Sequence, residues 1–293
     1  MSTLRFHGAA REVTGSMHLI EVNGRTVALD CGLFQGRRAE ATNKNKTFPI
    51  DPKQLDAVIL SHAHIDHSGK LPRLVKEGFT GPIYATPATC DLAGVMLADA
   101  AHIQEEDAGY LNRKQIKAWE RNGRKGNPPP EIQPLYNADD AARTATLLQP
   151  HRLGNPFEVV PGLRATFHEA GHMLGSAGVL LEITERKGKT LRVTFTGDLG
   201  RRHLPILRDP APLPACDYLI CESTYGARMT DEPTDMTARF GEVLRETFAR
   251  GGKVVIPAFA VGRTQMLVYA FNQLYRRGEL PPGTTLVVDS PLA

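Results

Sequence analysis

The chain has no long hydrophobic run and no secretion signal at its N-terminus. A helix that spans a membrane needs about 20 consecutive, mostly apolar residues, and no such stretch occurs. The first residues also lack a positively charged segment followed by an apolar one, which is the pattern of a signal peptide. We therefore expect a globular, cytoplasmic protein without a membrane partner.

Cysteine is scarce, with four in 293 residues and no C-x-x-C pair. A disulfide framework or a thiolate zinc site would need more cysteines at closer spacing, so the sequence argues against both. We expect the four to be reduced residues of the core: Cys31, Cys90, Cys216 and Cys221.

A large excess of one charge is also absent, since the formal net charge is +3 at pH 7. Such a small value does not require a polyanionic partner. Six basic residues nevertheless gather between residues 113 and 125, before three prolines at 128–130. We favour a solvated helix face for them and leave contact with phosphate open as the second interpretation.

Three histidines and an aspartate, in contrast, fall within the six residues HAHIDH at 62–67. The apolar run at 57–60 before them is typical of a strand buried on both faces. The segment 69–77 after them has the apolar spacing of an amphipathic helix. The hexapeptide is therefore expected on a turn between a strand and a helix.

The residue types of this hexapeptide are ligands that zinc accepts in proteins. On an extended segment alternate side chains point the same way, so His62 and His64 can hold one ion. Asp66 and His67 then face a neighbouring position. Two adjacent metal ions are a more natural expectation than one, and further ligands must come from elsewhere in the chain.

Two later residues are suited to complete such a site. His172 lies among glycines in the segment 169–176, and Asp198 follows a predicted strand at 191–195. Either residue alone would be read as an ordinary loop histidine or turn aspartate. Together with the hexapeptide, both become candidate metal ligands.

The remaining pattern predicts an α/β protein. Asn23-Gly24 separates two β-like runs, which is a strong hairpin signal. Beyond residue 225 the sequence predicts alternating helices and strands, with strands at 254–256 and 286–289.

Several motifs, in this order along the chain, resemble those of the metallo-β-lactamase fold: LDCG with Asp30, HAHIDH, GHMLGS with His172 and TGDLG with Asp198. The later segments ESTYG at 222–226 and IPAFAVGR at 256–263 resemble the β-CASP branch of that fold, which contains RNA-processing nucleases. The resemblance implies a four-layer αββα sandwich over residues 1–224. Residues 225–293 would be the start of an incomplete α/β β-CASP domain.

The resemblance also implies a role for each motif residue. One zinc ion would be held by His62, His64 and His172, the second by Asp66 and His67, with Asp198 between them. Two further roles are implied: Asp30 would orient the site, and Glu222 would polarise a catalytic histidine. From its place beside the metals, Asp66 is also a candidate to accept a proton from the attacking water. Separately, Arg263 at the start of a predicted helix is a candidate phosphate contact, and a helix cap with a surface arginine is the equally favoured alternative.

The later β-CASP motifs of the family each supply a histidine, one as general acid and one as a ligand of the second zinc. Both would fall beyond Ala293, so we expect a truncated chain whose second metal site is one ligand short.

The expected activity is zinc-dependent, endonucleolytic hydrolysis of RNA phosphodiester bonds, and an added 5′→3′ exonuclease action is left open. RNA is the expected partner, and a homodimer is left open. Two alternatives stay open at this point: a hydrolase of small esters or thioesters, because the same fold serves several chemistries, and an inactive binding partner of such nucleases.

Overall fold

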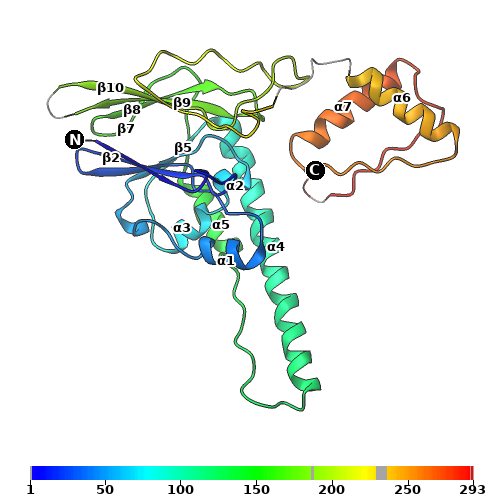
Figure 1. The fold of residues 1–293 in the computed structure, drawn as a ribbon, viewed down its shortest axis with the longest axis horizontal. Helices are drawn as coiled ribbons and strands as arrows, with labels where there is room; N and C mark the ends of the chain where they lie inside the picture. Colours follow the sequence, from blue (N-terminus) through cyan, green and yellow to red (C-terminus); the bar gives the residue numbers. More distant parts are fainter. Residues whose placement is uncertain (1, 186–187, 229–235, 291, 293) are drawn as a thin grey trace. The chain divides into compact units, whose positions relative to one another are not determined.

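The computed structural model of the protein describes residues 2–185, 188–228, 236–290 and 292. It divides into two compact units (Figure 1). Unit 1 comprises Met1–Arg201 and Asp209–Glu222, and unit 2 comprises Arg202–Arg208 and Ser223–Ala293. The proposed domain boundary at residue 224 remains a prediction.

The first sheet of unit 1 has six strands in sequential order: β1 (Thr3–His7), β2 (Met17–Val22), β3 (Arg25–Leu29), β4 (Ala57–Ile59), β5 (Ile83–Ala85) and β6 (Leu148–Pro150). The first three strands are antiparallel and the others continue in parallel from β3. The hairpin between β2 and β3 turns at Asn23 and Gly24, whose φ angles are 53° and 84°. Positive φ at both turn residues is the geometry that an Asn-Gly hairpin favours, so this prediction is confirmed.

The second sheet has five strands: β7 (Phe157–Val160), β8 (Leu163–Glu169), β9 (Ala177–Thr184), β10 (Thr190–Phe195) and β11 (Tyr218–Ile220). Neighbouring strands are antiparallel, except that β11 pairs with β10 in parallel. Cys221 follows the edge strand β11 and is exposed, whereas Cys31 is buried. The expectation of four core cysteines is therefore wrong for Cys221, because an edge strand leaves one side of its end open to solvent.

The core lies between the two sheets. Buried side chains of β3 and β4, such as Leu29 and Ile59, belong to one cluster with Phe167, Val179 and Leu181 of the second sheet. These side chains are apolar and almost fully removed from water, so their burial is the main stabilising term of unit 1.

The helices of unit 1 gather beside the first sheet (Figure 1). They are α1 (Arg38–Asn45), α2 (Ile65–Ser68), α3 (Leu71–Lys76), α4 (Pro87–Arg121) and α5 (Ala138–Leu147), with a 3-10 turn at Pro52–Gln54. The α/β class is confirmed, and a second helical layer over the other sheet stays a prediction.

Helix α4 is 35 residues long and has a well-defined start. The Thr86 side chain accepts a hydrogen bond from the N–H of Thr89, and Pro87 occupies the first helical position. The helix continues well beyond the sheets before the chain returns toward α5 (Figure 1).

Unit 2 contains α6 (Met236–Ala249) and α7 (Arg263–Arg276), and no strand among its described residues. The strands predicted at 254–256 and 286–289 are therefore wrong for this structure. Val255 and Val287 are 89% and 77% exposed, so nothing packs over these two side chains. A β-like run needs a hydrogen-bonding partner before it becomes a strand.

In the described part of the chain, none of the helices combines the length and the apolar character that a membrane span requires.

The packing of the core predicts that two phenylalanines in strands contribute very differently to stability. Phe167→Ala removes a fully buried ring and should lower the free energy of unfolding by about 3–5 kcal/mol. The same change at Phe6, which is 55% exposed, should cost less than about 1 kcal/mol. Urea denaturation followed by circular dichroism measures both, and equal losses would contradict this account of the core.

Candidate metal centre

The candidate ligands lie where strands and short loops of unit 1 end. Asp30 follows β3, and His62 and His64 follow β4, the parallel neighbour of β3. Asp66 and His67 lie on α2, which begins directly after His64. Loops after β8 and β10 supply two more ligands from the second sheet, His172 and Asp198.

Four donor atoms of these residues converge. The Nδ1 atom of His64 lies 3.1 Å from Nε2 of His62 and 3.1 Å from Nε2 of His172. Asp198 Oδ2 lies 3.9 Å from His62 Nε2 and 3.5 Å from His172 Nε2. All four donors are within 4.8 Å of one another, and three imidazole nitrogens with one carboxylate oxygen are a donor set that zinc accepts. The residues present therefore fit a metal ion.

A second set of donors adjoins the first. His67 Nε2 lies 3.4 Å from Asp198 Oδ1 and 3.8 Å from Asp66 Oδ2. The two oxygens of Asp198 thus face different groups, Oδ2 toward His62 and His172 and Oδ1 toward His67. The structure brings all six predicted ligands together in one place, with Asp198 at the centre.

Asp30 lies beneath this centre and is fully buried. Its Oδ2 is 2.8 Å from His67 Nδ1 and accepts hydrogen bonds from the hydroxyls of Ser16 and Ser61 at 3.1 and 3.0 Å. Its Oδ1 accepts the backbone N–H of Ser61 at 2.8 Å. A buried carboxylate is costly unless it is fully hydrogen-bonded, and Asp30 meets that condition. The contact with Nδ1 leaves Nε2 of His67 facing the metal centre.

The backbone of Asp30 is itself unusual, because its φ angle of 59° lies in the left-handed region. Aspartate tolerates this region better than most residues, but the conformation still costs free energy. The backbone N–H of Asp30 donates to the carbonyl of Ile59 on β4 at 2.9 Å, which fixes the conformation.

The histidines of the centre differ in their protonation state near pH 7. Burial and the neighbouring histidines lower the pKa of His64 to about 4, and burial first also lowers the pKa values of His62 and His172. These imidazoles are neutral near pH 7 and offer lone pairs to a cation. Burial also disfavours the charged form of His67, but the carboxylates of Asp30 and Asp198 outweigh it and raise the pKa of His67 to about 10.

The loop that carries His172 is fixed from two sides. The Ser176 hydroxyl oxygen accepts the backbone N–H groups of His172 and Met173 at 3.0 and 3.1 Å. The carbonyl of Gly175 accepts the hydroxyls of Thr86 and Thr89 at 2.6 and 2.8 Å. The start of α4 is therefore attached to the ligand loop.

Two glycines allow the ligand segments to approach each other. A Cβ on Gly200 would collide with the backbone of Gly171, next to His172. A Cβ on Gly32 would collide with the carbonyl of Asp66. Only glycine fits at either close contact.

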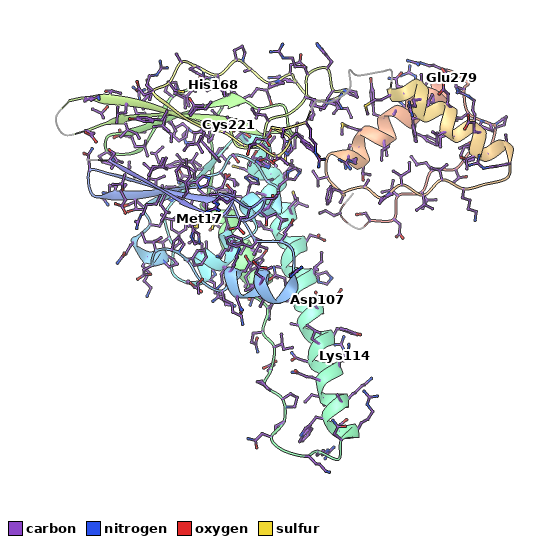
Figure 2. All side chains as sticks on the ribbon, in the orientation of Figure 1. Met17, Asp107, Lys114, His168, Cys221 and Glu279 are labelled. Atoms are coloured by element: carbon purple, nitrogen blue, oxygen red, sulfur yellow. The ribbon has the colours of Figure 1, made fainter. Side chains whose placement is uncertain are left out.

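The other predicted residues lie apart from these donors. The Glu222 carboxylate accepts the backbone N–H of Leu199 at 3.0 Å, which supports the segment that bears Asp198. Arg263 is exposed at the first residue of α7 in unit 2, and its contact with phosphate stays a prediction. His168 on β8, labelled in Figure 2, is not among the clustered ligands.

Sequence reasoning missed the residues that hold the ligands in place: Ser16, Ser61, Ser176, Thr86 and Thr89. A weak signal existed for two of them, because Ser61 directly precedes the hexapeptide and Ser176 closes the segment around His172. The threonines carry no such signal, since their contact with Gly175 joins residues 86 positions apart or more.

Gly200→Ala should weaken metal binding because the added methyl group separates the loops of Asp198 and His172. A loss of affinity on the order of 10–100-fold is expected, as for other changes to groups that support metal ligands. Competition with a fluorescent chelator measures it. The matched control Gly94→Ala has open space around its Cβ on α4 and should bind metal like the unaltered protein. Equal affinities for all three proteins would contradict the close-contact account.

The shifted pKa values of these histidines predict how the stability of the metal-free protein depends on pH. Below pH 6.5 His62, His64 and His172 become protonated in the unfolded chain but stay neutral in the folded protein, because their folded pKa values are lowered. The free energy of unfolding therefore falls as the pH is lowered. Above pH 6.5 His67 loses its proton in the unfolded chain but keeps it in the folded protein up to about pH 10. The free energy of unfolding therefore also falls as the pH is raised.

Urea denaturation in a chelator, over about pH 5–9, measures both sides of this maximum. His64→Gln should flatten the acid side and His67→Gln the alkaline side. A variant that changes neither side would contradict the assigned protonation states.

The chain is similar to several known proteins. The sequence model of the metallo-beta-lactamase superfamily matches residues 10–250. Ribonuclease TTHA0252 of Thermus thermophilus is 38% identical over 286 residues, which are 98% of this chain and 58% of that protein. The transcription termination factors FttA of Methanosarcina mazei and Pyrococcus abyssi are 32% and 34% identical, over 94% and 93% of this chain and 40% of each factor.

A solved subclass B3 metallo-beta-lactamase from a soil metagenome library is 16% identical, with a TM-score of 0.35 over 62% of this chain and 56% of that chain. The chain thus spans roughly half the length of the curated relatives that it matches. Because the family model matches most of its residues, the chain belongs to the metallo-beta-lactamase superfamily.

Proposed function

We propose that this chain carries the metal centre of a ribonuclease that hydrolyses phosphodiester bonds in RNA. The observation that carries the proposal is the convergence of His62, His64, His172 and Asp198, with donor atoms within 4.8 Å of one another. The family implies a metal, and this donor set is well suited to zinc.

Two zinc ions are proposed for the complete protein. The first would be held by the four clustered ligands, and the second by His67 Nε2 and Asp66 beside Oδ1 of Asp198. When bound, such a pair lowers the pKa of water and neutralises charge that develops on phosphate oxygens.

The chain's own residues set the remaining conditions. Burial raises the pKa of Asp66, which makes its carboxylate a better proton acceptor for an attacking water. Asp30 holds the ring of His67 in one orientation through the 2.8 Å contact with Nδ1. Glu222 steadies the Asp198 segment through Leu199 and, by resemblance, would also polarise a catalytic histidine.

The choice of RNA rests on the relatives. A protein named a ribonuclease matches 98% of this chain, and factors named for transcription termination match it over nearly the same extent. The motifs at 222–226 and 256–263 point to the β-CASP branch, so we propose that unit 2 is part of a β-CASP domain. A homodimer and a cytoplasmic location remain predictions.

Graded substitutions test the function. In the complete protein, His64→Ala and Asp198→Ala should abolish both metal binding and cleavage of labelled RNA, because each removes a clustered donor. Asp30→Asn should reduce cleavage by roughly 10–100-fold, because it weakens the support of His67 without removing a clustered donor. Metal content by mass spectrometry and RNA cleavage on gels provide the two readouts.

His102→Ala is the control, because the His102 side chain is 69% exposed on α4. It should bind metal and cleave RNA like the unaltered protein. Cleavage of RNA by the metal-free His64→Ala protein would overturn the assignment. Turnover of a thioester but not of RNA by the unaltered protein would favour the alternative hydrolase.

A further inference from the structure

The free end of α4 has two opposite faces. Asn112, Gln115 and Trp119 lie on one face and hydrogen-bond to the returning segment at the carbonyls of Ile132, Pro130 and Gly126. At 100° per residue these three side chains share one side of the helix. The returning segment therefore covers that side.

The opposite side carries a stripe of cations, which we call the α4 stripe: Arg113, Lys114, Lys117 and Arg121. Together with Tyr110 and Glu120 they line a surface hollow of about 590 Å³. All four cations are exposed, and Tyr110 is 57% exposed. Lys114 is labelled in Figure 2 on the part of α4 beyond the sheets.

Carboxylates do not neutralise this stripe. Glu120 is the single acidic residue between 110 and 125, and it pairs with Arg124 at 3.2 Å. No ion pair joins any of the four stripe cations to an acidic residue in the described part of the chain. Like charges three and four residues apart destabilise a helix, so the stripe has a cost that a bound polyanion would remove.

We infer that the α4 stripe binds the phosphate backbone of a single-stranded RNA whose other end reaches the metal centre. That the bound strand is RNA rests on the proposed function. The cations recur at about one helical turn, roughly 6 Å apart, which suits a row of phosphates. The exposed ring of Tyr110 among them offers a surface on which a base can stack, as in other proteins that bind single strands.

Other polyanions fit less well. A membrane surface would need an apolar face beside the cations, and the returning segment occupies the opposite face of α4. An acidic peptide would use the charges but has no base to place against Tyr110.

The helix also explains how the stripe and the metal centre could act on one strand. Thr86 and Thr89, at the start of α4, hold the loop of His172 through the carbonyl of Gly175. Arg113 lies 24 residues beyond Thr89, about 36 Å along the helix. Only a strand that spans at least this distance can touch both places at once.

The test compares two triple variants of the full chain with the same change in charge. The stripe variant is Lys114→Gln, Lys117→Gln and Arg121→Gln. The control variant replaces exposed cations elsewhere in unit 1, as Lys46→Gln, Lys53→Gln and Arg152→Gln. Circular dichroism and thermal melting verify that both are folded.

Affinity for labelled single-stranded RNA is measured by fluorescence anisotropy across a salt series, with strand integrity checked on gels. For a strand of roughly 30 nucleotides the stripe variant should bind about ten-fold more weakly or worse. Its salt slope should fall by about 2, since each phosphate contact contributes about 0.7. The control should stay within about two-fold of the unaltered protein.

Each outcome decides a separate point. If the unaltered protein cleaves RNA but the two variants bind long RNA equally well, RNA binding by the α4 stripe is contradicted and the proposed function is supported. If long RNA binds through the stripe and is never cleaved, RNA binding by the stripe is supported and the proposed ribonuclease function is contradicted. No binding of long RNA by the unaltered protein would contradict both. Stronger competition by polyglutamate or anionic vesicles than by RNA would also overturn the assignment of the stripe to RNA.

Discussion

The hydrogen-bonded contact between Asp30 and His67 is the constraint on which the centre depends. It joins the end of β3 to α2 and holds a buried carboxylate beside a buried imidazole at 2.8 Å. Ser16 and Ser61 satisfy the remaining lone pairs, so the pair is stable without water. Because Asp30 also accepts the backbone N–H of Ser61, directly before His62, this one carboxylate fixes both ends of the hexapeptide.

The second sheet contributes the other half of the centre through loops that are equally constrained. The His172 loop is held by Ser176 and by the start of α4, and Gly200 lets the Asp198 segment lie directly against it. The packed core thus positions two sets of strand ends, and the ligands belong to the short segments that leave them. This division between a rigid apolar scaffold and polar loops is common in enzymes.

Much of this arrangement could be predicted from the sequence, because it depends on local patterns. The Asn23-Gly24 hairpin and the strand before the hexapeptide follow from turn chemistry and apolar periodicity, and the clustered ligands follow from motif order. The groups that support them could not be predicted, since Thr86 and Gly175 meet only through the tertiary fold. The strand predicted at 254–256 was wrong, because a β-like run does not reveal whether a neighbouring strand exists.

The central claim is that these side chains hold metal, and anomalous X-ray scattering from crystals grown with zinc tests it most directly. The account predicts a strong anomalous peak between His62 Nε2, His64 Nδ1, His172 Nε2 and Asp198 Oδ2. Zinc bound elsewhere, with no peak among these four donors, would contradict the account.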